Sequence, residues 1–187
     1  MTTEQQQRRD LMAWLVAAAR TGDGGAFGQL AALAGPRLLG HARRLCDDDE
    51  TAADLVQDGW AQIVRGLRGL HDDRAFLPWA LRIVTRLAAR DVRGRMARRR
   101  LALGLAAEGQ PVTQAQDETA DVAVLRTAIA RLSPAHAAAL TLFYLDDMSV
   151  AEVAIALDIP PGTVKTRLMH ARDNLRALLK GNENGQV

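Results

Sequence analysis

Four arginines are spaced so that they could bind a polyanion. Arg82, Arg86, Arg90 and Arg93 recur at intervals of four, four and three residues, which lines them along one edge of an α-helix. Aligned like charges repel one another, so the row is unfavourable unless a polyanion neutralises it. Three more arginines follow at 98–100. This edge predicts contact with nucleic acid; a solvated basic face is the alternative.

Residues 161–179 form a second candidate contact with nucleic acid. On a helical wheel, one stripe is apolar and must face a core: Val164, Leu168, Ala171, Leu175 and Leu178. The rest of the wheel carries small polar, apolar and charged side chains: Thr163, Lys165, Thr166, Met169, His170, Arg172, Asp173 and Arg176. A helix that binds in a major groove needs small polar or apolar side chains facing the base edges and cationic side chains facing the phosphates. An ordinary amphipathic surface helix is the alternative.

The residues just before this helix predict a helix-turn-helix. Ser149 and Glu152 form a capping box, in which each side chain accepts a hydrogen bond from a free backbone N–H at a helix start. Val150, Val153 and Leu157 follow at helical spacing. The segment 158–161, Asp-Ile-Pro-Pro, then ends the first helix and opens the second with proline in its first turn.

The run 47–67 predicts a helix with an acidic outer face. Its acidic start at 47–50 suits the positive end of the helix dipole. The predicted core residues are Ala52, Val56, Trp60, Ile63 and Leu67. The residues predicted to point away are Asp54, Gln57, Asp58, Ala61 and Arg65. From these residues alone, the outer face is either solvated or a docking surface.

Three further helices complete the predicted framework. One covers 4–20, with a core face made of Leu11, Trp14, Leu15 and Ala18. A second covers 26–46, where Gly35-Pro36 should break or kink it. After a polar loop at 70–74, a third begins near Ala75 and turns these residues to the core: Phe76, Trp79, Ala80, Ile83 and Leu87.

Composition favours an all-α fold, and the sequence lacks the motifs of common catalytic sites. The chain has 187 residues, 48% of them apolar and only 4% aromatic, with a net charge of +2. We find no paired nucleophile and base and no phosphate-binding glycine loop in the sequence, so we expect no catalysis and no cofactor. A single cysteine, Cys46, and four scattered histidines predict no disulfide and no metal site. Without a run of about 20 apolar residues, we expect a soluble protein of the reducing cytoplasm.

Both halves resemble extracytoplasmic-function (ECF) RNA polymerase sigma factors. Residues 132–134 (LSP), 149–154 (SVAEVA) and 162–168 (GTVKTRL) resemble sigma region four. Residues 53–58 (ADLVQD), followed by Trp60, Trp79 and the Arg82-Ile83 pair, resemble region two. The resemblance implies a region two domain over 1–100, a linker over 101–121 and a region four domain over 122–180, with a disordered tail at 181–187. The linker would thread toward the RNA exit path, or act as a simple tether.

The resemblance also assigns roles to residues. The face that binds the β′ clamp of core RNA polymerase would comprise Asp54, Leu55, Gln57, Asp58, Ala61 and Arg65. A loop would capture a flipped base of the minus-ten element, and the helix after it would lie near the point where the duplex melts. The residues of these two elements that would contact DNA are His71, Asp72, Arg74, Trp79, Arg82, Arg86, Arg90 and Arg93. The minus-thirty-five duplex would be read by Thr163, Lys165, Thr166, Arg167, Met169, His170, Arg172 and Arg176. The other implied partners are promoter DNA, the polymerase β flap and an anti-sigma factor, with the chain itself a monomer.

One departure from the family pattern affects these roles. Arg86 stands where the family commonly has asparagine, which predicts more phosphate contact and less base reading at that position. Two other functions stay open on the residues alone. One is a conventional helix-turn-helix regulator with a helical sensing domain, and the other is an adaptor that sequesters a protein without binding DNA.

Overall fold

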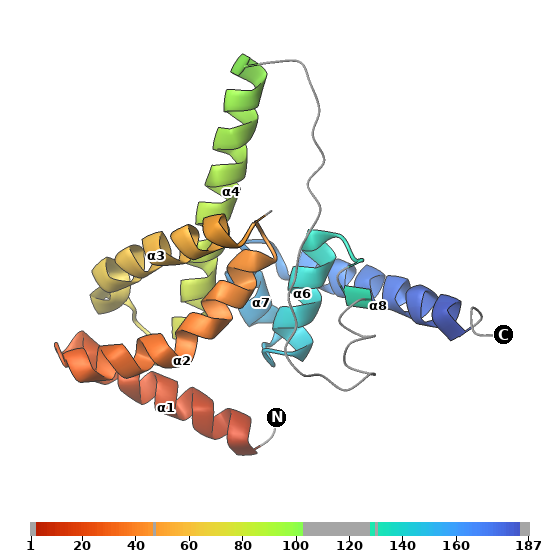
Figure 1. The fold of residues 1–187 in the computed structure, drawn as a ribbon. Coiled ribbons are helices and arrows are strands. Elements are labelled where there is room, and N and C mark those ends of the chain that lie inside the picture. Colours follow the sequence, from red (N-terminus) through yellow and green to blue (C-terminus); the bar gives the residue numbers. More distant parts are fainter. Residues whose placement is uncertain (1–2, 47, 103–127, 130, 184–187) are drawn as a thin grey trace. The chain divides into compact units, whose positions relative to one another are not determined.

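The computed structural model describes residues 3–46, 48–102, 128–129 and 131–183. All regular secondary structure in these ranges is helical, as predicted (Figure 1). The chain divides into two compact units, described separately below. The first contains the N-terminal residues through Gly109, and the second contains most of the chain that follows. The predicted linker lies outside the described residues, except for Leu101 and Ala102 at a helix end.

The first unit is a bundle of four α-helices with two short 3₁₀ helices between the last two. The helices are α1 (Thr3–Arg20), α2 (Gly24–Arg43), α3 (Asp49–Gly66), η1 (Leu67–Gly69), η2 (Asp73–Ala75) and α4 (Phe76–Ala102). Aspartates start two of them: Asp23 accepts from the N–H groups of Gly25 and Ala26, and Asp48 accepts from Thr51 N–H at 2.7 Å. The C-terminal part of α4 extends beyond α2 and α3 (Figure 1).

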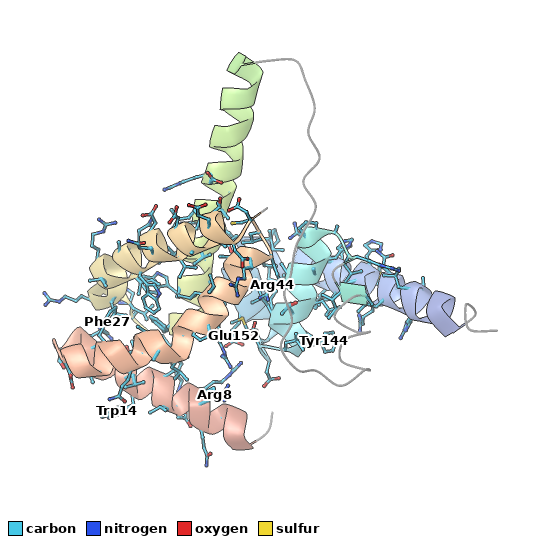
Figure 2. The ribbon with its side chains drawn as sticks, viewed as in Figure 1. Arg8, Trp14, Phe27, Arg44, Tyr144 and Glu152 are labelled. Carbon is cyan, nitrogen blue, oxygen red and sulfur yellow. The ribbon has the colours of Figure 1, made fainter. Side chains whose placement is uncertain are left out.

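Helix α1 buries a stripe rotated from the predicted one, and Leu15 is the predicted residue that is fully buried. Met12, Leu15 and Val16 are buried, whereas Leu11 is 48% and Trp14 62% exposed. Figure 2 labels Trp14 on this helix. The wheel could not separate the two stripes because apolar residues occupy both, and packing against α2 and η2 selects one.

The core faces of α3 and α4 are also rotated from the prediction. Ala52 and Ile63 of α3 are buried as predicted, as is Leu67 directly after it, but Val56 and Trp60 are half-buried and Leu55 and Gly59 are buried instead. Trp60 packs edge to face on Phe27 of α2, with ring centroids 5.8 Å apart. On α4, Phe76 and Ala80 are buried as predicted, but Trp79, Ile83 and Leu87 are half-buried. The prediction missed Leu77, Leu81, Val84 and Ala88, which are buried because α4 packs on both α2 and α3.

Two predicted helix interruptions differ from the structure. Helix α2 is continuous through Pro36, so of the break or kink expected there, the break does not occur. Proline removes one N–H donor, but Ala34 and Leu38 on either side are fully buried, and this packing holds the helix together. At the other end of the chain, α8 continues to Glu183, so residues 181–183 are helical rather than disordered; residues 184–187 lie outside the described range.

The second unit contains α6 (Pro134–Tyr144), α7 (Val150–Leu157) as far as Ala154, and α8 (Pro161–Glu183). Its core joins α6 to α8 through Leu132, Ala137, Leu140 and Ala171, with Ile129, Leu175 and Leu178 packed against them. Pro134 lies in the first turn of α6, and Ser133 occupies the N-cap position without a side-chain cap bond. Of residues 122–131, where the prediction placed the start of this domain, only 128–129 and 131 are described.

Candidate nucleic-acid interface

The capping box predicted at the start of α7 is present. Ser149 N–H donates to Glu152 Oε2 at 2.7 Å, and Glu152 N–H donates to Ser149 Oγ at 3.2 Å. At the other end of α7, Asp158 takes a left-handed conformation with φ 55°. Ile159 N–H then bonds to Ala154 O, and Asp158 N–H to Ile155 O, which is the Schellman arrangement. These local bonds set the turn that starts α8 at Pro161.

Helix α8 presents the predicted polar face to solvent. Val164, Leu168 and Ala171 are buried, and Leu175 and Leu178 are half-buried, so the apolar stripe is confirmed. The exposed residues are Lys165, Thr166, Met169, His170, Arg172, Asp173 and Arg176; Thr163 is half-buried. Met169 is 46% exposed, so its apolar side chain is accessible to a partner. The face therefore offers both apolar and cationic contacts.

Hydrogen bonds on α8 limit what some of these groups can do. The Thr166 hydroxyl donates to Gly162 O at 3.2 Å, which leaves its oxygen lone pairs and methyl group for a base edge. Arg172 Nε donates to Leu168 O at 3.2 Å, so its other guanidinium donors are available to a phosphate. Arg176 makes an exposed ion pair with Asp173 at 3.6 Å, which a phosphate could replace.

Two of the predicted contacts on α8 have other neighbours. Arg167 is half-buried and borders the apolar stripe, so it is the least accessible of the predicted cations. His170 is exposed, but its ring lies 6.0 Å from that of His136 on α6. Their positions make both residues weaker candidates for direct DNA contact than Lys165 or Arg172.

In the first unit, the arginine row lies along α4. Arg82 is half-buried, and Arg86 and Arg90 are exposed. Arg93 lies further along α4, where only the backbone is described. Val84 and Ala88 on the same stretch are buried, so Arg82 and Arg86 lie on the packed part of α4, and the helix extends beyond α2 and α3 only toward its C-terminal end (Figure 1).

The loop before α4 is held at both ends and exposed in the middle. Leu70 and Phe76 are buried, while His71, Asp72 and Arg74 are exposed. Asp72 Oδ1 accepts from Arg74 N–H at 2.9 Å, which starts the 3₁₀ turn η2. Trp79, one turn into α4, is half-buried, with its ring 6.1 Å from that of Phe76.

The acidic face of α3 is exposed, with one correction. Asp54, Gln57, Asp58, Ala61 and Arg65 are all exposed. Leu55, which the resemblance placed in the same contact set, is only 8% exposed and belongs to the core. The prediction missed Val64, which is 53% exposed and three residues after Ala61 on this helix. Its spacing of three residues from Ala61, which makes the two neighbours on a helix, was the available signal.

No group of three or more histidine, cysteine, aspartate or glutamate residues suited to a metal ion occurs in the described part of the chain. Among those same residues, none of the helices is long and apolar enough to cross a membrane.

These features define an all-α protein with a helix-turn-helix unit and a separate helical unit that exposes one acidic and one arginine-rich helix. Two family models match the chain: Sigma-70 region 2 over residues 30–108, and Sigma-70, region 4 over residues 123–175. Together they cover more than half of it. The chain belongs to the ECF sigma factors of the sigma-70 family, which are transcription initiation factors.

Individual relatives agree with this assignment. The ECF RNA polymerase sigma factor SigM of Mycobacterium tuberculosis is 34% identical over 167 residues, covering 88% of this chain and 83% of SigM. The RNA polymerase sigma-H factor of Pseudomonas aeruginosa is 26% identical over 193 residues, covering 96% of both chains. Among solved structures, the sigma factor RpoE of Bartonella quintana, in complex with the anti-sigma factor NepR, matches with a TM-score of 0.70 and 25% identity. That match covers 82% of this chain and 96% of RpoE.

Proposed function

We propose that this sigma factor binds core RNA polymerase through the exposed face of α3 and directs it to promoters that α8 reads. The observation that carries the proposal is the pairing, on one chain, of both sigma-70 regions with exposed polar faces at the corresponding helices. The polymerase face comprises Asp54, Gln57, Asp58, Ala61, Val64 and Arg65. Leu55 is omitted because it is buried.

The two units would contact promoter DNA differently. On α8, Thr166 and Met169 would meet base edges of the minus-thirty-five element, while Lys165, Arg172 and Arg176 would meet phosphates. In the first unit, the exposed loop residues would hold an extruded base of the minus-ten element. The arginines of α4 would neutralise the separated strands.

Strand opening would require the polymerase. Unstacking and extruding a base requires about a few kcal/mol per step. The loop exposes only a few side chains to a base, so this free energy would come from the whole holoenzyme contact. The chain itself would act as a cytoplasmic monomer and catalyse nothing, since nucleotide addition is the work of the polymerase.

An anti-sigma factor would regulate the chain. The related RpoE of Bartonella quintana is held in complex with an anti-sigma factor. Such a partner would cover the same α3 or α8 faces that the active protein needs, so bound sigma factor could not join the polymerase.

The test uses purified core polymerase and a promoter library randomised at both elements. The chain should direct run-off transcription from a specific subset and should open no promoter alone. The double charge reversal Asp54→Lys with Asp58→Lys should abolish association with core polymerase, whereas Asp173→Lys on α8 should leave association in the absence of DNA intact.

Two outcomes would contradict the proposal. A footprint on duplex DNA without polymerase would indicate a conventional helix-turn-helix regulator. If the chain neither binds DNA nor alters transcription in the presence of polymerase, it is a sequestering adaptor.

A further inference from the structure

Helix α1 lies before the part of the chain that matches Sigma-70 region 2, which begins at residue 30. It is nevertheless built into the first unit, because Met12, Leu15 and Val16 are buried. It packs on α2 and also on η2, the short helix inside the exposed loop. Helix α1 is therefore placed to control the shape of that loop.

An ion pair joins α1 to the middle of the loop. Arg20 Nη1, in the last turn of α1, lies 2.7 Å from Asp73 Oδ1. The two side chains are only 32% and 28% exposed. A short, charge-assisted hydrogen bond with limited solvent access is stronger than an ordinary surface pair. It links residues that are 53 positions apart in the chain.

A second contact between the same elements is weaker. Arg74 Nη2 lies 3.7 Å from Asp10 Oδ1, and the two side chains are 75% and 51% exposed. At this distance and exposure the pair contributes little. The connection between α1 and the loop therefore depends mainly on Arg20.

The loop needs such a connection because its own anchors are at its ends. Leu70 and Phe76 are buried, and the Asp72 cap on Arg74 N–H fixes one turn of backbone. Between these anchors His71, Asp72 and Arg74 point to solvent, whereas Asp73 bonds to α1. Arg20 thus holds the middle of the loop in place and leaves His71 and Asp72 exposed.

We propose that Arg20 is a positioning residue that sets minus-ten selectivity by preorganising the loop 70–76 through Asp73. This inference rests on the proposed function of the loop. Without Arg20, the loop would have to be ordered when a base binds, and that ordering opposes binding. The correct base makes the most contacts with the ordered loop, so its binding would be weakened more than that of other bases. Discrimination between minus-ten bases should therefore fall.

The test is run-off transcription by the holoenzyme on a library randomised at the minus-ten element. Arg20→Gln should lower discrimination between the best and the second-best minus-ten base about five-fold. Preference at the minus-thirty-five element and association with core polymerase should stay unchanged. Asp73→Asn should have the same effect, the double variant should add little to either, and Arg20→Lys should restore most of the loss.

The matched control removes a different ion pair from the same unit. Arg43 of α2 pairs with Asp49 of α3 at 3.1 Å, and neither residue belongs to the loop, so Arg43→Gln should leave minus-ten discrimination unchanged. Amide hydrogen exchange gives a second measurement: residues 71–75 should exchange faster in Arg20→Gln than in Arg43→Gln.

The possible failures are distinguishable. If the wild type directs specific transcription and Arg20→Gln keeps full minus-ten discrimination, the inference is wrong and the proposed function stands. If Arg20→Gln and Arg43→Gln weaken both promoter elements equally, Arg20 has only a structural role and the inference is again wrong. If the wild type gives no promoter-specific transcription, the proposed function fails and this inference fails with it.

Discussion

The buried histidine of the first unit should make that unit sensitive to acid. His41 on α2 is fully buried, and its Nε2 lies 2.8 Å from Thr85 Oγ1 on α4. The one proton of the Thr85 hydroxyl has backbone carbonyl acceptors, Leu81 O at 3.0 Å among them, so its oxygen accepts from His41, and Nε2 carries the proton. Within the described part of the chain, Nδ1 has no hydrogen-bond partner. Burial, with a smaller contribution from the charge of Arg44, lowers the pKa of His41 from 6.5 to about 3.

The sign and size of the effect follow from that pKa difference. Between pH 6.5 and about 3 the unfolded chain binds a proton at His41 and the native chain does not. The free energy of unfolding therefore falls as the pH drops, by up to about 1.4 kcal/mol per pH unit. Stability from this group is complete above pH 6.5. Between pH 7 and pH 5 the loss should be about 2 kcal/mol.

Urea unfolding followed by tryptophan fluorescence measures this loss in the right place. All three tryptophans of the chain, Trp14, Trp60 and Trp79, lie in helices of the first unit, so their signal reports that unit alone. His41→Gln keeps a donor for Thr85 but cannot titrate. In this variant, the unfolding free energy should fall between pH 7 and pH 5 by about 2 kcal/mol less than it does in the wild type.

The control is His71→Gln, which removes an exposed histidine from the same unit and should leave the pH dependence of the wild type unchanged. An NMR titration of the wild type gives an independent check, because the His41 ring signals should not shift between pH 7 and pH 5. If His41→Gln lost as much stability as the wild type over this range, or if His41 titrated near pH 6, burial would not control its protonation and the reasoning would be refuted.

Three further predictions concern packing, capping and charge. Gly66→Ala would place a Cβ 2.9 Å from Trp79 Cζ2, so it should destabilise the first unit by about 1–3 kcal/mol in the same urea assay. Gly28→Ala in α2, whose Cβ meets nothing within 4 Å, should instead stabilise it by about 0.5–1 kcal/mol. Ser149→Ala should raise amide exchange across α7 by an amount equivalent to about 1 kcal/mol; Ser133→Ala should change exchange in α6 less, because Ser133 makes no side-chain cap bond. Arg172→Ala should reduce the slope of log affinity against log salt concentration, for holoenzyme on duplex promoter DNA, by about one unit, as loss of one phosphate contact does. The control is Arg131→Ala, at an exposed site off α8, which should leave the slope unchanged. An unchanged slope in Arg172→Ala would contradict the phosphate contact.

The features predicted correctly from sequence are those set by local chemistry. The Ser149–Glu152 capping box and the proline start of α8 depend on residues a few positions apart, and both are present. The apolar stripe of α8 was also correct, because one face of that helix is clearly apolar and the other polar. Local hydrogen bonds and clear amphipathicity can be read without knowing the partner helix.

The core face of α3 could not be read in this way because it centres on a glycine. A Cβ built on Gly59 would lie 3.4 Å from Val84 Cγ2 of α4, so α4 packs closely at a position without a side chain. A hydrophobic wheel gives glycine no weight, and the prediction therefore filled the middle of the stripe with Val56 and Trp60, although Ala52, Ile63 and Leu67 were correct. With the stripe rotated, Leu55 moves into the core and Val64 is exposed, which changes the membership of the candidate polymerase face.

The close approach at Gly59 also bears on how the two candidate surfaces of the first unit act together. Helix α3 carries the acidic face on one side and packs on α4 with the other, and α4 carries the arginine row. Buried contacts at van der Waals distance do not allow one helix to slide freely on the other. A polymerase bound to α3 would therefore hold α4, and with it the arginines that would meet the separated strands, at a fixed distance. Under the proposed function, docking and strand binding are geometrically linked within one small bundle, without any conformational change between them.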